Sequence, residues 1–565
     1  MRHLVNYKHL NTLLANNYLQ QSMPSSSQQA SSLLVLPALL VAALVSLPIF
    51  VTLISLAQPA GPVWEHLRNT VLNEYLVNTF ALMTLTGGLS LLFGISTGWL
   101  IGACHFRGRA TLSWLLMLPL ASPAYIVAYV YTDLLDASGS VQTALRSWLS
   151  LGITDLQFLP IRNLTGAAVL LSLVLYPYVY LLCRNSFAGR SGVQFDAARV
   201  LGHSPLSAFF RIALPAARPA IVGGLALVLM ETLADFGVVS YFSVPTFSTG
   251  IFRTWLGLGD PQAALKLASL MLLFVILLVC LEESSRRGAV DRSDISRTSQ
   301  ISLTGIRGFV AISVCVLPIV LGFVVPAVTL AIYAADNFNS VIQARFAELA
   351  LNSVSLAIAA GVGVTLIAWV LAYVKRLHPS SLSHSLIRVS TLGYALPGIL
   401  LAVALLKPVG VFDHWLITTW PGLSSSVLSG SLFLLFYAYV CRFLTVAYQS
   451  VDSGFAGISH DIDAAARTLG TTTTEMIRKI HFPLLRPSIF AASLLVFVDV
   501  MRELPATLIL RPFNFDTLAT QVYRLASDER LAEASGSALL IVILGVLPVV
   551  LLQRTKPLEN DPLST

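Results

Sequence analysis

One polar stretch occurs twice in this largely apolar chain. Residues 196–219 read DAARVLGHSPLSAFFRIALPAARP, and residues 463–487 read DAAARTLGTTTTEMIRKIHFPLLRP. A shift of 268 positions superimposes nine identical residues, which are Ala197, Ala198, Arg199, Leu201, Gly202, Ile212, Pro215, Arg218 and Pro219 in the first copy and Ala465, Ala466, Arg467, Leu469, Gly470, Ile480, Pro483, Arg486 and Pro487 in the second. Because the copies lie so far apart, the repeat indicates duplication of a whole domain rather than a stack of short units.

Each copy predicts a helix, a tight turn and a second helix. An Ala-Ala-Arg segment favours the first helix, and Gly202 or Gly470 follows where that helix should end, because glycine accepts the left-handed backbone found after a C-terminus. Ser204 is a good N-cap for the second helix, and Thr472 with Glu475 has the spacing of a capping box. Proline predicts the end of the second helix, near Pro215 in one copy and near Pro483 in the other.

The composition is that of an integral membrane protein. Of the 565 residues, 56% are hydrophobic and 11% are charged, whereas a soluble domain has about 25% charged residues. The mean hydropathy is +0.77. Basic loops on the cytoplasmic side explain the net charge of +7, so the lipid bilayer is the expected partner and nucleic acid is not.

Twelve apolar runs predict about twelve transmembrane helices, six in each half, in an all-α polytopic fold. Their ends are placed to within about two to four residues. The runs lie at about 33–56, 76–103, 113–134, 165–183, 219–241 and 264–282, and then at about 308–333, 350–374, 387–407, 429–448, 487–510 and 537–553.

These runs predict two membrane domains and three polar segments. The polar tail 1–32 is predicted to be disordered, an Arg-rich linker occupies 285–307, and a short tail occupies 556–565. The membrane domains are predicted at 33–284 and 308–555. Because Lys and Arg concentrate in alternate loops, both copies of the repeat, the linker and both termini are expected to lie in the cytoplasm.

Two acidic residues follow each copy of the repeat, within the next apolar run. They are Glu231 and Asp235 in METLADFG, and Asp499 and Glu503 in DVMRELPA. The i, i+4 spacing predicts that each pair shares one face of a continuous helix, from mid-membrane to the outer half. Charged groups inside a membrane are costly, so the four acids are candidates for the lining of a cation path, with Glu231 the first choice. The alternative is a structural role, expected above all for Glu503 beside Arg502.

Other motifs exclude some kinds of chemistry. The chain has no GxxxxGK[ST] phosphate loop, no H-E-x-x-H and no G-x-S-x-G, so catalytic residues and ATP hydrolysis by this chain are not expected. Five cysteines without a CxxC pair predict no metal site and no bound cofactor. His203 and His481 are expected at the surface of the cytoplasmic loops, and Asn78 and Asn352 are expected to hydrogen-bond between helices.

The repeated loop resembles the EAA loop of the permeases of ATP-binding cassette (ABC) importers. That pattern is Glu-Ala-Ala, three residues, glycine, about nine residues and Ile-x-Leu-Pro, and Asp196, Ala464 and Phe482 are the departures from it here. The resemblance implies a type I ABC importer permease fold, docking on a cytoplasmic ATPase dimer that holds ATP and Mg, and a separate substrate-binding protein. The docking residues it implies are Asp196, Ala197, Ala198, Gly202, Ile212, Pro215, Asp463, Ala465, Ala466, Gly470, Ile480 and Pro483.

Three further stretches resemble the fused permeases of ferric-iron importers. They are METLADFGVVSYF, FRTWLGLGDPQAA and VDVMRELPATLILRPFNFDTLA, and the similarity covers about residues 33–555. This resemblance implies iron transport across a bacterial inner membrane with a ferric-binding protein as partner. Thiamine and phosphonate permeases share the fused plan and stay open as alternatives. A secondary transporter that uses the acids for ion coupling is disfavoured, because the two halves keep the same orientation.

Overall fold

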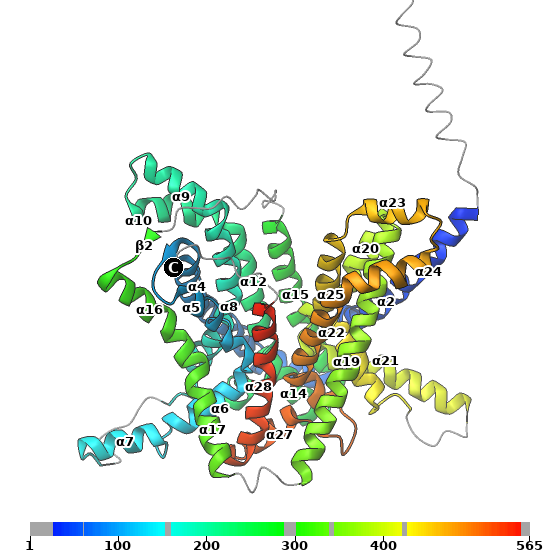
Figure 1. The fold of residues 1–565 in the computed structure, drawn as a ribbon. Coiled ribbons are helices and arrows are strands. Elements are labelled where there is room, and N and C mark those ends of the chain that lie inside the picture. Colours follow the sequence, from blue (N-terminus) through cyan, green and yellow to red (C-terminus); the bar gives the residue numbers. More distant parts are fainter. Residues whose placement is uncertain are drawn as a thin grey trace, which may run out of the picture.

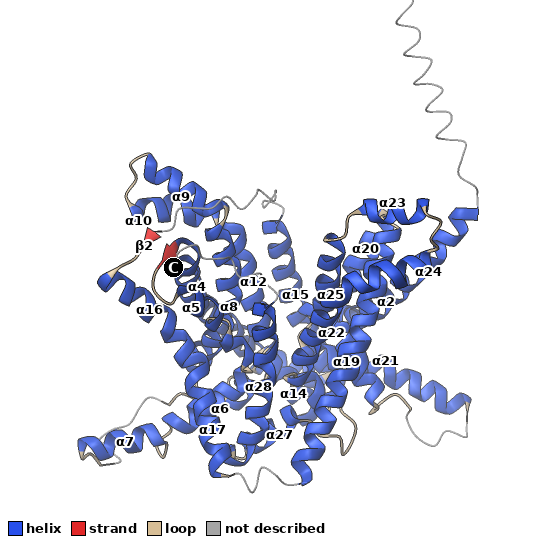
Figure 2. Cartoon of the chain, in the orientation of Figure 1, coloured by secondary structure: helices blue, strands red, loops and turns tan. Residues whose placement is uncertain are grey.

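The computed structural model describes residues 26–59, 61–152, 160–286, 301–337, 344–420 and 427–554. The described part is almost wholly helical (Figure 2), which confirms the all-α prediction. Its strands are the two-residue β1 (Cys104–His105) and β2 (Ile301–Ser302), which pair in parallel. The first helix begins at Ser26, so residues 26–32 of the predicted tail are helical. The rest of that tail, most of the linker 285–307 and the tail 556–565 lie outside the described residues.

The first half comprises residues 26–286 (Figure 1). Its helices are α2 (Ser26–Ala57), α3 (Pro62–Thr70), α4 (Leu72–Ala103), α5 (Arg109–Leu115), η1 (Leu118–Ala121), α6 (Ala124–Leu135), α7 (Ser140–Leu149), α8 (Leu164–Ala188), α9 (Arg190–Val200), α10 (Pro205–Ala208), η2 (Phe209–Ala213), α11 (Leu214–Ala216), α12 (Arg218–Ala234), α13 (Gly237–Tyr241), α14 (Phe247–Phe252), η3 (Arg253–Gly257) and α15 (Pro261–Arg286).

The second half comprises residues 301–554 and repeats this order. Its helices are α16 (Gly305–Ile319), η4 (Val320–Val324), α17 (Val325–Asp336), α19 (Ala344–Leu377), α20 (Ser381–Ser390), η5 (Leu392–Ala395), α21 (Gly398–Thr419), α22 (Leu432–Ala456), α23 (His460–Thr468), α24 (Thr473–Met476), η6 (Ile477–His481), α25 (Phe482–Met501), α26 (Pro505–Leu510), α27 (Leu518–Ser527) and α28 (Leu531–Arg554). The pair η1 and η5 is offset by 274 positions, and the pair α8 and α22 by 268.

Ten helices in the described residues are long and apolar enough to cross a membrane, and there are twelve if each of two bent pairs is one span. The predicted span over 113–134 is not one continuous helix, because the chain bends by 88° between Ala121 and Ala124. Ser122 is extended there, as a residue before proline prefers to be, and Pro123 then starts α6. The predicted span 387–407 is divided in the same way before Pro397.

The first helix of each half packs on the other half. In Figure 1, α2 lies beside α20, while α16 and α17 lie beside α4 and α6. Cross-half hydrogen bonds support this exchange. The Tyr437 hydroxyl donates to the carbonyl of Leu44 on α2 at 2.6 Å, and the Tyr131 hydroxyl donates to the carbonyl of Leu321 at 2.7 Å. The halves therefore form one interlocked unit rather than two separate bundles.

The two asparagines do hydrogen-bond across the fold, but not between helices as the sequence predicted. The Asn78 side-chain amide donates to the carbonyl of Pro245 at 3.1 Å, and the Asn352 amide donates to the carbonyl of Asp516 at 3.3 Å. Both acceptors lie in the loop that precedes a short helix, α14 or α27, rather than on a neighbouring membrane helix. The asparagines thus satisfy loop carbonyls at equivalent places in the two halves.

Three glycines on α4 allow close packing against α8. They are Gly94, Gly98 and Gly102, spaced four apart on one face. A Cβ at Gly94 would lie 2.5 Å from the Cβ of Val179, and a Cβ at Gly98 would lie 2.9 Å from the Cβ of Cys183. Small residues at this spacing let membrane helices approach closely.

We therefore expect Gly94→Ala to destabilise the protein by about 1–3 kcal/mol, the usual cost of overpacking. Gly88→Ala on the same helix is the matched control, because a Cβ there would have no neighbour within 4 Å. Thermal unfolding of the purified protein should show a lower Tm for Gly94→Ala and an unchanged or higher Tm for Gly88→Ala. Equal Tm values for the two variants would contradict this packing.

Candidate functional site

The two copies of the repeated loop lie at the same end of the molecule, α9 and α10 in the first half and α23 and α24 in the second (Figure 1). Each loop turns at the predicted glycine in left-handed backbone, with φ of +90° at Gly202 and +77° at Gly470. The predicted caps are also present. Ser204 Oγ accepts from the Ser207 N–H at 3.3 Å, and Thr472 with Glu475 forms a capping box.

The second loop helix does not end at Pro483, as the sequence predicted. It continues through the π-helical turn η6 into α25, and the N–H of Phe482 bonds the carbonyl of Ile477, five residues back. This wider turn is followed by proline, which has no N–H to contribute. In the first half the prediction near Pro215 is close, since the chain bends by 64° between Ala216 and Arg218.

Leucine next to each turn glycine is almost fully exposed. The exposed fraction is 81% for Leu201 and 84% for Leu469, and Val200 beside Leu201 is also exposed. The other predicted docking residues divide by exposure. Ala197, Gly202, Ala465, Gly470 and Pro483 are exposed, Asp196, Ile212, Pro215 and Ile480 are half-buried, and Ala198, Asp463 and Ala466 are buried. Next to each turn glycine, an exposed leucine and an exposed alanine of the preceding helix form an apolar surface at the end of the loop.

Aromatic side chains support the first loop from below. The ring of Trp99 on α4 lies edge-on to Phe187, Phe195 and Phe209, with centroids 5.1, 5.0 and 4.7 Å away. Such edge-to-face contacts add to the stabilisation that burial of the rings provides. The first loop is therefore held against the membrane helices by apolar packing.

A polar network supports the second loop at the same place. Asp463, at the position of Phe195, accepts from Arg376 Nε at 2.9 Å and lies 2.9 Å from His481 Nε2. The Tyr373 hydroxyl lies 3.1 Å from His481 Nδ1. Burial alone would raise the pKa of Asp463, but hydrogen bonds from Arg376 and His481 outweigh burial and hold this pKa below its usual value. The prediction that His481 lies at the surface is wrong, because its exposed fraction is 0%.

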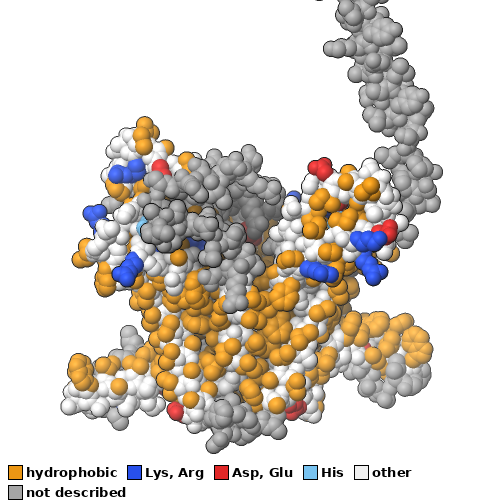
Figure 3. Space-filling model, viewed as in Figure 1, with side chains coloured by type: hydrophobic (Ala, Val, Ile, Leu, Met, Phe, Trp, Pro, Cys, Tyr) orange, Lys and Arg blue, Asp and Glu red, His pale blue; other side chains and the backbone are white. Residues whose placement is uncertain are grey.

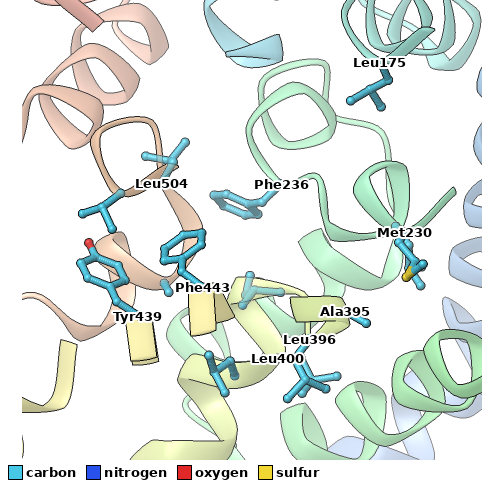
Figure 4. Close-up of a cluster of buried hydrophobic side chains, with 14 of the residues drawn as sticks. Leu175, Met230, Phe236, Ala395, Leu396, Leu400, Tyr439, Phe443 and Leu504 are labelled. Carbon is cyan, nitrogen blue, oxygen red and sulfur yellow. The ribbon is translucent and has the colours of Figure 1, made fainter. Parts of the chain in front are cut away.

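A cavity of about 140 Å³ lies between the two halves and brings the four predicted acids together. Its wall is made by Leu120, Ser122, Pro123, Ala124, Tyr125, Leu171, Val174, Leu175, Tyr178, Glu231, Ala234, Asp235, Phe236, Gly237, Tyr394, Arg442, Phe443, Asp499, Arg502, Glu503, Leu504 and Pro505. Figure 4 shows part of the apolar wall, where Phe236 of the first half lies beside Leu504 and Phe443 of the second. The polar groups of the cavity are thus held in an apolar frame.

The two acids of each pair do not share one continuous helix, which corrects the prediction from their spacing. Helix α12 ends at Ala234 and α25 ends at Met501, so Asp235 and Glu503 lie in breaks. Asp235 Oδ2 accepts from the N–H groups of Val238 and Val239, at 3.1 and 3.2 Å.

Glu503 does the same in the second half. Its Oε1 accepts from the N–H of Ala506 at 3.0 Å, and its Oε2 accepts from the N–H of Thr507 at 2.9 Å. A carboxylate suits a helix N-terminus because it satisfies free N–H groups and complements the helix dipole. One acid of each pair therefore caps the short helix that follows, α13 or α26.

The acids differ between the halves in their cationic partners. Arg502 donates to Asp499 at 2.5 Å, and Arg442 of α22 donates to Glu503 at 3.4 Å. The predicted pairing of Glu503 with Arg502 is therefore wrong. Among the described residues, neither Glu231 nor Asp235 has an ion pair with Lys or Arg. The first half thus presents two carboxylates without a paired cation, and the second half presents two that are paired.

Two hydrogen bonds cross between the halves at the cavity. The Tyr394 hydroxyl in η5 donates to Glu231 Oε1 on α12 at 3.1 Å. Arg502, just after α25, donates to the carbonyl of Leu120 in η1 at 2.7 Å. The elements η1 and η5 are equivalent, so each bond joins the end region of α12 or α25 to the equivalent short turn in the other half. These bonds close the cavity at related positions.

Sequence reasoning missed Tyr394, Tyr178 and Arg442 as parts of this site. A signal existed for Arg442, which is a charged residue inside the predicted span 429–448. The tyrosines carried no comparable signal. Within the described ranges, no group of three or more His, Cys, Asp or Glu side chains is arranged to hold a metal ion.

Comparison with known proteins gives one family match in each half. The model of the family described as binding-protein-dependent transport system inner membrane component matches residues 90–282 and residues 364–555, more than half of the chain. The chain is 25% identical over 497 residues to the Fe(3+)-transport system permease protein FbpB 2 of Haemophilus influenzae. The aligned region covers 85% of this chain and 90% of that protein.

Two other relatives match shorter segments. The molybdenum transport system permease protein ModB of Escherichia coli is 30% identical over 181 residues, which is 32% of this chain and 72% of ModB. PhnV of Salmonella typhimurium, whose name assigns it to 2-aminoethylphosphonate transport, is 27% identical over 127 residues, which is 22% of this chain and 48% of PhnV.

Proposed function

This chain belongs to the family of binding-protein-dependent transport system inner membrane components, and on that premise we propose that it passes ferric iron into a bacterial cell. It is a multi-pass membrane protein and the permease subunit of an ABC importer, a transport subunit rather than an enzyme. Permeases of this family work with an ATPase and a binding protein. The proposal adds that the binding protein carries ferric iron and that ATP and Mg bind to an ATPase dimer.

The charge of the cavity between the halves is the observation that favours a cation as the substrate. Its wall contains four carboxylates and two guanidinium groups, Arg442 and Arg502. Those two groups lie against Asp499 and Glu503, so the remaining negative charge belongs to Glu231 and Asp235. An excess of carboxylates favours a cation and repels molybdate and phosphonate, which are anions. The match to the Fe(3+) permease over 85% of the chain supports iron, whereas the molybdenum and phosphonate relatives match a third of the chain or less.

In this proposal the ATPase acts through the two loops. From the positive charge in the adjacent loops we infer that the loops and both termini lie in the cytoplasm. Closure of an ATPase dimer would push the exposed surfaces around Leu201 and Leu469 together. The cavity then opens on the other side when the bonds from Tyr394 to Glu231 and from Arg502 to Leu120 break. A binding protein would deliver iron there.

The acids then take different roles. Glu231 and Asp235 form the iron path, since no basic side chain of the described chain pairs with them. Asp499 and Glu503 keep the second half in position through Arg502 and Arg442. Asp235 and Glu503 also hold the short helices α13 and α26 at the cavity.

Uptake in cells tests the substrate. Deletion of this chain should abolish uptake of radiolabelled ferric iron that depends on the importer, and leave uptake of labelled molybdate and 2-aminoethylphosphonate unchanged. Expression of the chain from a plasmid should restore iron uptake. Loss of molybdate or phosphonate uptake with normal iron uptake would contradict the proposal.

Single substitutions test the roles of the acids. Glu231→Gln should reduce iron uptake strongly and leave the Tm near that of the parent, because no paired cation is left behind. Asp499→Asn should lower the Tm, because Arg502 loses its partner. Breaking a buried ion pair costs about 3–5 kcal/mol, and this pair, which is partly open to the cavity, should cost less. Normal uptake with an altered Tm in Glu231→Gln would mean that the acid holds helices together and lines no path.

Two glycine variants test the docking loops. Gly470→Glu should prevent co-purification of the ATPase, because it puts charge and a strained left-handed residue into the docking surface. Gly430→Glu is the control, since Gly430 also has positive φ, +75°, and open space, but lies on the loop before α22 at the opposite end. If both variants bind the ATPase, or if both variants lose ATPase binding, the result would argue against docking at Gly470.

A further inference from the structure

Two helical segments project sideways from the molecule, one from each half. The first arm is α7 (Ser140–Leu149), and the second arm is the last part of α21, residues 408–419, with Trp420 directly after it. In Figure 1 they leave the lower part of the molecule on opposite sides, away from the end that carries the repeated loops. They occupy equivalent places in the repeat, and the offset between the halves changes there from 274 to 268 positions.

Buried polar groups fix the base of the first arm. Gln142 Nε2 donates to the carbonyl of Leu135 at 2.7 Å, and Arg146 donates to Gln142 Oε1 at 2.8 Å and to the carbonyl of Ala137. Gln142 and Arg146 are both buried. The only charged side chain of this arm is therefore turned inward, and the arm is held rigidly to the end of α6.

One carboxylate fixes the second arm in the same manner. Asp413 is buried and accepts from three successive N–H groups, of Val427 at 3.2 Å, Leu428 at 2.9 Å and Ser429 at 2.7 Å. These contacts attach the arm to the turn that starts α22. The acid of this arm is thus hidden, as the basic residue of the first arm is.

Each arm leaves an apolar aromatic face without a partner in the described chain. On α7 this face consists of Val141, Leu145, Trp148 and Leu149, at helical spacing. The first two are half-buried, while Leu149 is exposed and Trp148 is 80% exposed. Thr143 lies on the opposite, polar face.

The second arm carries a larger cluster. The ring centroids of Phe412 and Trp415 are 5.7 Å apart, and those of Trp415 and Trp420 are 6.0 Å apart. All three side chains are exposed, as is Val411. His414 is also exposed and lies about 100° around this helix from Trp415.

We propose that both arms are interfacial anchors that lie in the headgroup region of one leaflet, the leaflet opposite the repeated loops. Tryptophan prefers this region because its ring is apolar and its N–H is polar. An amphipathic helix with an aromatic face lies in the plane of the interface. In Figure 3 hydrophobic side chains cover the visible face of the second arm and continue into the apolar band of the molecule.

Two observations favour lipid over a protein partner. The arms differ in length and sequence between the halves but keep an exposed aromatic face, and a fluid lipid surface needs no fixed register. They also point away from the cavity between the halves, where a binding protein must deliver its cargo. The identification of this leaflet as the outer one rests on the proposed orientation of the chain. Its position on the side opposite the repeated loops does not depend on that orientation.

Spin labels in proteoliposomes test the anchors. A Cys280→Ala background removes the exposed native cysteine, the other four being buried. Labels at Leu149→Cys and Trp415→Cys are compared with labels at Thr143→Cys and His414→Cys, which lie about 100° or more around the same helices from the first two. We expect the ratio of collision rates with oxygen to those with a water-soluble nickel complex to be several-fold higher at the first two positions.

Equal ratios on the two faces would overturn the proposal. So would protection from both reagents that appears only after a binding protein is added, because it would make the faces a protein contact. A second experiment needs no cysteine variants. Brominated lipid should quench the tryptophan fluorescence of Trp148→Phe and of Trp415→Phe less than that of the parent protein. Since no transport is measured, these results are independent of whether iron is the substrate.

Discussion

Backbone groups inside a membrane must find hydrogen-bond partners within the protein, and this requirement shapes the centre of the structure. Helices α12 and α25 both break there, and each break frees N–H groups of residues that are buried in the fold. Asp235 and Glu503 fill that need from within the chain by capping α13 and α26. The cavity exists because these helices stop short, and it stays polar because the residues that allow them to stop are acids.

The two halves have the same order of helices but stabilise equivalent sites with different side chains. Aromatic rings around Trp99 support the first loop, while the second loop depends on Asp463 with Arg376 and His481. At the cavity the first half leaves its carboxylates without cations, and the second half pairs them. A duplicated membrane protein can therefore keep its symmetry in the helices and place its asymmetry in charge.

Sequence patterns predicted the features that depend on local backbone. The repeat identified two halves, and Gly202, Gly470 and the Thr472–Glu475 box were placed correctly because left-handed turns and caps need particular residues. The breaks after Ala234 and Met501 were missed. Pro505 at the start of α26 was a signal for the second break, whereas α13 begins without a proline and its N–H groups are met by Asp235. His481 was misplaced for a similar reason. Only the fold shows that it lies under the loop, where Asp463 replaces an aromatic residue.

The exchange of first helices has a consequence for biogenesis. As the chain is synthesised, α2 is made early, whereas its partners α20 and α21 are made hundreds of residues later. Until then, among the described residues of its own half, α2 packs mainly on α15, for example through the bond between Ser55 and Ser269 at 2.7 Å. The newly made first half is thus an open structure that awaits its complement. Fusion into one chain guarantees that the complement arrives at the same place in the membrane and in equal number.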